Sequence, residues 1–160
     1  MKIAIKVAKK IIGGLLSVGD HSVEIVEAGM EMSKENESWT DRTPQLKIVC
    51  KNEAGQITSW MNLKGYKNAT DFPNAVAPKG FEFRSYSDES EKFLVDKKTG
   101  KRVQSEERTE KLLSNVGNLA FAAGVTEEEI DLDELTTTLV GESIGVRVRE
   151  NSRGQVEAHY

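Results

Sequence analysis

Cysteine is almost absent from this 160-residue chain, which contains only Cys50. One cysteine excludes an intramolecular disulfide and any multi-cysteine metal site. Cys50 alternates with Leu46 and Ile48, and this favours a small core side chain over a reactive thiol. Long apolar runs are also lacking, since no stretch approaches the roughly 20 residues that a membrane helix needs. With 38% hydrophobic and 30% charged residues, the composition predicts one soluble, cytoplasmic globular domain with no membrane partner.

The N-terminus carries lysines at positions 2, 6, 9 and 10, followed by an apolar run at 11–16. This arrangement superficially suggests a signal peptide. Gly13 and Gly14 interrupt the run and no convincing small-residue cleavage site follows, so we interpret the segment as mature protein. A short basic arm of this kind is weak evidence for phosphate binding.

Catalytic and metal-binding patterns are scarce. Neither histidine, His21 or His159, has a partner at metal-ligand spacing, and Gly13-Gly14 lacks the lysine of a phosphate-binding loop. The acidic run at 127–129 is typical of a first helical turn, where carboxylates complement the helix dipole. The sequence therefore predicts a protein that is not an enzyme and needs no metal or cofactor.

The net charge of −4 is unevenly distributed along the chain. Residues 105–134 contain nine acidic and two basic residues, a balance of −7, so the remainder carries +3. A basic remainder can attract phosphates while an acidic flank faces away. The acidic total is thus compatible with nucleic-acid binding.

The order of predicted elements indicates an α+β fold that is mainly β. Alternating patterns predict strands at 18–32, 45–52 and 57–63, then at 144–150 and 155–160. Helices are expected within 105–141, the second of them opened by a capping box of Asp131 and Glu134. A long insertion at 65–104 includes a strand at 81–86 and a hairpin around 97–100. Five strands with helices between the third and fourth match an OB-like barrel, here a single domain over 1–160.

Six short stretches within residues 15–160 carry a family resemblance. They are GDHSVEIVEA at 19–28, TPQLKIV at 43–49, GQITSW at 55–60, AFAAG at 120–124, LVGE at 139–142 and VRV at 146–148. In pattern and order the chain resembles phage-encoded single-stranded-DNA-binding proteins of the OB-fold class. The resemblance implies binding of single-stranded DNA with little sequence specificity, protecting it during phage DNA replication or recombination in the host cytoplasm. It is compatible with a homo-oligomer and with replication or recombination proteins as further partners.

Trp60 is the best candidate for stacking on bases, which together with a basic groove is what single-strand binding requires. Strand alternation places Thr58, Trp60 and Asn62 on the face shared by Lys47, Val49 and Lys51. The structural alternative is that Trp60 packs beneath the insertion. Lys47, Lys51, Trp60 and Asn62 are therefore the predicted centre of the interface.

The other nucleic-acid-binding candidates lie in loops, in the insertion and on the fourth strand. They are Trp39, Arg42, Lys64, Tyr66, Phe83, Arg84, Tyr86, Lys97, Lys98, Lys101, Arg102, Arg147 and Arg149. Several have a structural alternative: Trp39 as a plug at the barrel end, Phe81 and Phe83 as anchors of the insertion to the core, the basic residues of 97–102 as a solvated turn, and the two later arginines as groups facing water. The alternative function is a protein-interaction or phage structural module on the same β-barrel scaffold.

Overall fold

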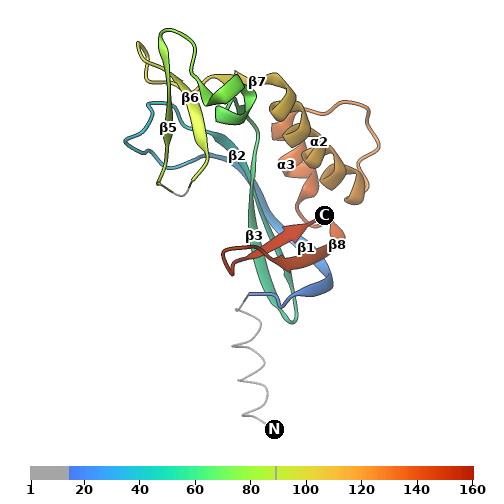
Figure 1. Ribbon diagram of the computed structural model, residues 1–160. Coiled ribbons are helices and arrows are strands. Elements are labelled where there is room, and N and C mark those ends of the chain that lie inside the picture. Colours follow the sequence, from blue (N-terminus) through green and yellow to red (C-terminus); the bar gives the residue numbers. More distant parts are fainter. Residues whose placement is uncertain (1–14, 89) are drawn as a thin grey trace. The chain divides into compact units, whose positions relative to one another are not determined.

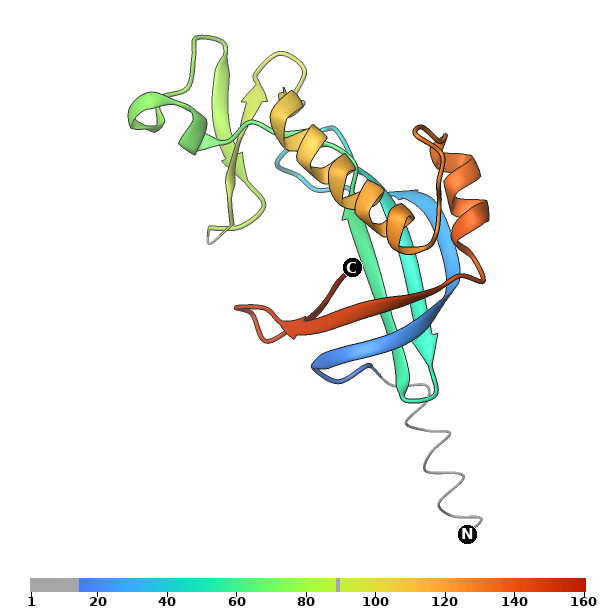
Figure 2. The same ribbon diagram turned by 90° about the vertical axis from the view of Figure 1, so that its right-hand side faces the viewer.

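A five-stranded antiparallel sheet in the order β3-β2-β1-β8-β9 dominates the computed structural model, which describes residues 15–88 and 90–160 (Figure 1 and Figure 2). The lysines at 2, 6, 9 and 10 and the glycines at 13 and 14 lie outside the described residues. The five strands are β1 (Gly19–Met32), β2 (Pro44–Asn52), β3 (Gly55–Asn62), β8 (Ser143–Glu150) and β9 (Val156–His159). All five predicted strands are confirmed to within about two residues at either end. With helices α2 (Glu106–Ala122) and α3 (Leu132–Leu139), this makes the chain an α+β protein.

Two compact units divide the chain. The first, here called the sheet unit, comprises residues 1–30, 46–61 and 115–160; the second, the insertion unit, comprises residues 31–45 and 62–114. Strands β1, β2 and β3 and helix α2 each contribute residues to both units. The predicted insertion at 65–104 therefore folds together with residues from outside it.

The core of the sheet unit consists of the inward side chains that alternate along its strands. Val23 and Ile25 on β1 and Ile144, Val146 and Val148 on β8 are all buried. The register confirms that they share a face, since Val23 lies opposite Ile144 and His21 opposite Val146. Leu119 from α2 and Leu135 and Leu139 from α3 are buried in the same unit. Alternation on the strands and the helical spacing of these leucines thus produce the hydrophobic core.

Helix α3 joins the sheet through backbone hydrogen bonds just after it ends. Gly141 N–H donates to the carbonyl of Ile25, and Ile25 N–H donates to the carbonyl of Glu142. Gly141 has a φ of 93°, a left-handed conformation that suits glycine at a helix end. The capping-box prediction at the other end is wrong: Asp131 is the N-cap residue, but its side chain makes no capping hydrogen bond. The helix starts where predicted for a different reason, because Asp131 still supplies the first backbone acceptor, to Leu135.

The two edges of the sheet, β3 and β9, are not joined by a strand ladder within the described residues. The side chain of Tyr160, which follows β9, reaches β3 instead, with its hydroxyl 2.8 Å from Oγ of Ser59 and 4.0 Å from Sγ of Cys50. Burial raises the pKa of the Tyr160 phenol and that of the Cys50 thiol. The sheet is therefore open along the backbone, with a tyrosine contact between its edges.

The insertion unit contains two short two-stranded sheets. One pairs β5 (Phe81–Ser85) with β6 (Lys92–Asp96), and the other pairs β4 (Gly65–Tyr66) with β7 (Gln104–Ser105). Two 3₁₀ helices, η1 (Ala69–Asp71) and η2 (Pro73–Ala75), lie between β4 and β5. The hairpin expected around 97–100 is present as a tight turn, with Val95 bridged to Arg102. The first strand of that hairpin, β6, also pairs with β5, which local spacing did not indicate.

A buried arginine organises the interior of the insertion unit. The Arg102 guanidinium lies 4.3 Å from the ring centre of Trp39, 3.8 Å from that of Tyr66 and 5.6 Å from that of Phe93. Its Nε donates to Asp41 Oδ2 at 3.0 Å. The Arg102 side chain is only 7% exposed. Its positive charge is therefore stabilised by Asp41 and the three aromatic rings and not by water.

Candidate nucleic-acid interface

The β2–β3 hairpin displays one lysine-bearing face. The strand register is defined at both ends of the hairpin. At one end is the two-residue turn Glu53–Ala54, and at the other the Leu63 N–H donates to the Pro44 carbonyl. That register puts Lys47 opposite Trp60. The side chains on this face of the two fully described strands include two lysines and no acid, and Val49 among them is buried; they are Gln45, Lys47, Val49, Lys51, Gln56, Thr58, Trp60 and Asn62. The hairpin is therefore locally basic although the whole chain is acidic.

Trp60 is 52% exposed on this face. The alternating burial of β3 explains its position: Ile57 is buried, Ser59 is held by Tyr160, and Trp60 lies on the opposite side. Half of a tryptophan surface in water leaves a flat apolar area on which a base can stack. Trp60 thus has the exposure that a stacking residue needs.

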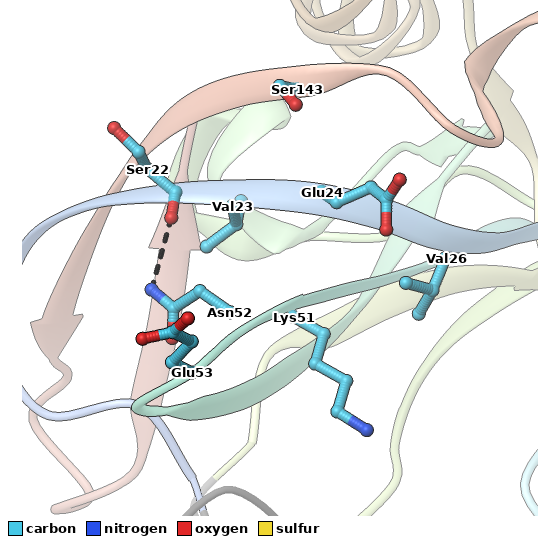
Figure 3. A pocket seen from close by; sticks show the side chains of 8 residues that line it. All are labelled: Ser22, Val23, Glu24, Val26, Lys51, Asn52, Glu53 and Ser143. Carbon is cyan, nitrogen blue, oxygen red and sulfur yellow. Dashed lines mark hydrogen bonds between the residues drawn. The ribbon is translucent and has the colours of Figure 1, made fainter.

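The face becomes mixed in charge on the neighbouring strand β1. A hollow of about 500 Å³ lies between β1 and β2, lined by Ser22, Val23, Glu24, Val26, Lys51, Asn52, Glu53 and Ser143 (Figure 3). Figure 3 shows Glu24 and Lys51 on opposite sides of it, with Asn52 Nδ2 donating to the Ser22 carbonyl at 3.1 Å. Lys47 lies 3.4 Å from Glu27 at their charged atoms. Of the two hairpin lysines, Lys51 has the freer charge.

Arg147 and Arg149 are both exposed on the outward side of β8. Arg147 Nε donates to Asp20 Oδ1 at 2.7 Å, and this pair holds the pKa of the Asp20 carboxyl below its usual range. Arg149 lies opposite Glu157 in the ladder and forms no ion pair with any described residue. The two arginines therefore differ in how much charge they can offer a ligand.

Four lysines meet at one end of the β5–β6 hairpin in the insertion unit. Lys97 and Lys98 follow β6, and Lys79 precedes β5. Lys101 lies beside Asp96, whose backbone N–H donates to the Lys101 carbonyl. Two acids lie close to these lysines: the Asp96 carboxylate accepts the Lys98 backbone N–H, and the Asp41 carboxylate accepts the backbone N–H of Arg102, the residue after Lys101. We call Lys79, Lys97, Lys98 and Lys101 the lysine turn. A cluster of lysine side chains of this kind attracts phosphate groups.

Three predicted ligand contacts lie inside the protein. Trp39 is 7% and Tyr66 4% exposed, and both rings contact Arg102. Arg102 is paired with Asp41 and donates to Thr43 Oγ1 at 2.8 Å. In this structure the three side chains form the core of the insertion unit and present no surface to a ligand.

The remaining predicted residues are scattered over the insertion unit. Arg42 Nε donates to the Ser33 carbonyl at 2.6 Å, and Lys64 Nζ lies 5.8 Å from the Tyr66 ring centre. Arg84 pairs with Glu82 and donates to the Ser38 carbonyl.

The aromatic candidates Phe83 and Tyr86 are not brought to the lysine turn. Phe83 packs against Phe72, another residue of the insertion, with 5.8 Å between ring centres. Tyr86 is 71% exposed but follows the opposite end of β5. Five strand residues place it roughly 17 Å from the turn.

Sequence reasoning missed two surface features. Lys79 is 18 positions from the nearest other member of the lysine turn, so only the pairing of β5 with β6 reveals it. Val26, 41% exposed, adds apolar surface beside Lys51. The alternation of Val23 and Ile25 as inward residues was the signal that would have put Val26 on the outward face.

Within residues 15–88 and 90–160, no helix has the length and apolar character to span a membrane. The same residues hold no cluster of three or more His, Cys, Asp or Glu side chains arranged to bind a metal ion. Neither a protein-family model nor a curated protein matches the chain.

Proposed function

We propose that this protein binds single-stranded DNA with little sequence preference, on an OB-like sheet whose outward β2–β3 face is the contact surface. The observation that carries the proposal is the half-exposed Trp60 on the same face as Lys47 and Lys51. A stacking aromatic with flanking cations is the minimal apparatus for binding any base sequence, because every base has a π-face and every nucleotide a phosphate.

The energetics favour single strands over duplex. Stacking on one aromatic contributes about 1–3 kcal/mol per base by alanine substitution, and duplex bases are already stacked on one another. Lys51 and the lysine turn would add counterion release, which is insensitive to sequence. The predicted roles in protecting DNA during replication or recombination follow from such binding and belong to the same proposal.

The decisive experiment is fluorescence anisotropy of a labelled oligo-dT with wild-type protein and Trp60→Ala. Loss of one stacking platform should weaken binding about 5- to 150-fold, corresponding to 1–3 kcal/mol. Phe121→Ala is the matched control, since Phe121 is an 82% exposed aromatic on α2, away from the β2–β3 hairpin in sequence. Equal affinity of wild type and Trp60→Ala would refute stacking on this residue.

Lysine contributions are measured by the salt dependence of the same binding. For single strands, each phosphate contact contributes roughly −0.7 to the slope of log affinity against log salt. Lys51→Gln should reduce the slope by about that amount. A control at Lys111, a helix lysine 3.7 Å from Glu107, should leave it unchanged.

A protein-interaction module is the second candidate function. The 82% exposed Phe121, on a helix that begins with Glu106 and Glu107, favours it. No gel shift of any oligonucleotide at low salt, with wild-type folding intact, would favour this alternative.

A further inference from the structure

A second hollow in the sheet unit lies over strands β1, β8 and β9 and has a volume of about 680 Å³. We call it the β8 hollow. Its lining residues are Asp20, His21, Ser22, Gly145, Val146, Arg147, Arg149, His159 and Tyr160. The β2–β3 hairpin contributes none of them, so this hollow is separate from the Trp60 face.

Strand register brings the polar side chains of the β8 hollow into one row. Asp20 lies opposite Arg147, and Arg147 lies opposite His159, so the three cross the sheet side by side. Arg149 is two residues further along β8 and points to the same side. Two guanidinium groups and an imidazole thus line the same hollow, and all three can donate hydrogen bonds to an oxyanion.

Gly145 leaves the floor of the β8 hollow open. Gly145 lies opposite Ser22 and two residues before Arg147 on the same side of β8. A Cβ atom placed on Gly145 would have no other atom within 4 Å. The neighbouring outward positions on β8 are Ser143 and Arg147, so the glycine creates a gap in an otherwise continuous row of side chains. A ligand oxygen can approach the sheet at this point more closely than anywhere a side chain stands.

Negative groups around the hollow are already engaged. Asp20 accepts from Arg147 Nε at 2.7 Å and from its Nη2 at 3.4 Å. Glu157 accepts from Asn151 Nδ2 at 2.9 Å and lies 3.8 Å from His159 Nε2. Arg149 lies opposite Glu157 in the ladder but forms no ion pair with any described residue, so its guanidinium hydrogens are not taken by a carboxylate.

We propose that the β8 hollow binds one phosphate group of a nucleic acid, held by Arg147, Arg149 and His159. The choice of a nucleic acid as the source of the phosphate rests on the function proposed above. Bidentate hydrogen bonding makes arginine suited to phosphate, and a second arginine two residues along a strand lies on the same face. The phosphate belongs either to a strand terminus or to the backbone, and the experiment separates these sources.

The first measurement uses inorganic phosphate and the full chain. Phosphate is titrated against potassium chloride at matched ionic strength, while NMR follows the Arg147 and Arg149 Nε–H and the His159 ring signals. Phosphate should shift these signals, and Arg149→Gln should weaken binding at least several-fold. Arg153→Gln is the matched control, because Arg153 is an exposed arginine of the same unit that does not line the hollow.

Two further variants distinguish a binding site from general surface charge. Gly145→Val fills the floor of the hollow at a position where strand geometry accepts a β-branched residue, and it should abolish the phosphate shifts. Asp20→Asn removes the carboxylate that competes for Arg147 and should tighten phosphate binding roughly three-fold. Equal responses of Gly145→Val and wild type would overturn the proposal, as would weaker binding by Asp20→Asn.

The second measurement identifies the source of the phosphate. A 5′-phosphorylated oligo-dT that binds several-fold more tightly than its 5′-hydroxyl counterpart, with the difference lost in Arg149→Gln, supports a terminal phosphate. Equal affinities that both weaken in Arg149→Gln support a backbone phosphate. No oligonucleotide binding together with intact phosphate shifts would refute the proposed function and keep the site. No phosphate shifts in either wild type or Asp20→Asn would refute the site, whatever the DNA affinity.

Discussion

Replacing Arg102 with methionine should unfold the insertion unit at a much lower temperature. Methionine keeps an apolar stem of similar length, so the change removes chiefly the guanidinium. The charge, the bond to Asp41 and the stacking on Trp39 and Tyr66 disappear together. Asp41, whose side chain is only 15% exposed, is left without its counter-ion.

The size of the effect follows from that burial. Removing one partner of a buried ion pair costs about 3–5 kcal/mol, mostly because the other charge stays desolvated. Desolvated cation–π contacts contribute on the order of 2 kcal/mol, and this partly overlaps with the first quantity. Taking about 4 kcal/mol overall, and roughly 2–4 °C per kcal/mol for a chain of this size, the melting temperature should fall by about 8–16 °C.

Differential scanning calorimetry of Arg102→Met beside Lys101→Gln provides the measurement. The neighbouring Lys101 is exposed in the lysine turn, so its substitution should leave the melting temperature within about 1–2 °C of wild type. Adding Asp41→Asn to Arg102→Met should recover part of the loss, because the unpaired carboxylate is then neutral. Equal melting temperatures for Arg102→Met and Lys101→Gln would refute the assignment of Arg102 to the core. Arg102 would then again be a candidate for contact with DNA.

Two further predictions concern stability. Gly65→Ala should destabilise the protein by about 1–3 kcal/mol in urea unfolding, because its Cβ would lie 2.5 Å from the Cβ of Arg108; Gly117→Ala in helix α2, with nothing within 4 Å, should be neutral or stabilising. Tyr160→Phe should cost about 1 kcal/mol at pH 7 through loss of the Ser59 hydrogen bond. Burial raises the pKa of the Tyr160 phenol, so the folded state keeps the proton longer than the unfolded state, whose tyrosines titrate near pH 10. Its contribution is complete below about pH 10 and is lost as the pH rises further; wild type should therefore lose stability more steeply than Tyr160→Phe between pH 9.5 and 11. An identical slope for both proteins would contradict the buried phenol.

The strands were predictable because their signals are local. Alternation along each segment and the turn-forming residues at 52–55 and 151–154 predict β2, β3, β8 and β9 to within about two residues. The face of Trp60 could be predicted in the same way. Side chains alternate along a strand, so Trp60, three positions after the inward Ile57, lies on the outward face. Parity, however, does not say whether another element covers a face, and only the structure gives the 52% exposure.

The interior of the insertion unit was not predictable for the opposite reason. Arg102 ends the basic run KKTGKR and has the same local pattern as the exposed lysines before it. Its partner Asp41 is 61 positions away, and its aromatic neighbours come from three separate segments. The hairpin around 97–100 was predictable, but nothing in its sequence indicates a carboxylate that comes from a distant loop.

The interleaving of the two units limits how the chain can be shortened. Because residues 31–45 and 62–114 alternate with segments of the sheet unit, neither unit corresponds to one contiguous fragment. A truncation at position 62 would discard Phe93 and Arg102 while retaining Trp39 and Asp41, leaving an aromatic ring and a carboxylate without the groups that bury them. Deletion mapping of activity in this protein would thus confuse misfolding with loss of a site, and point substitutions are the sounder approach.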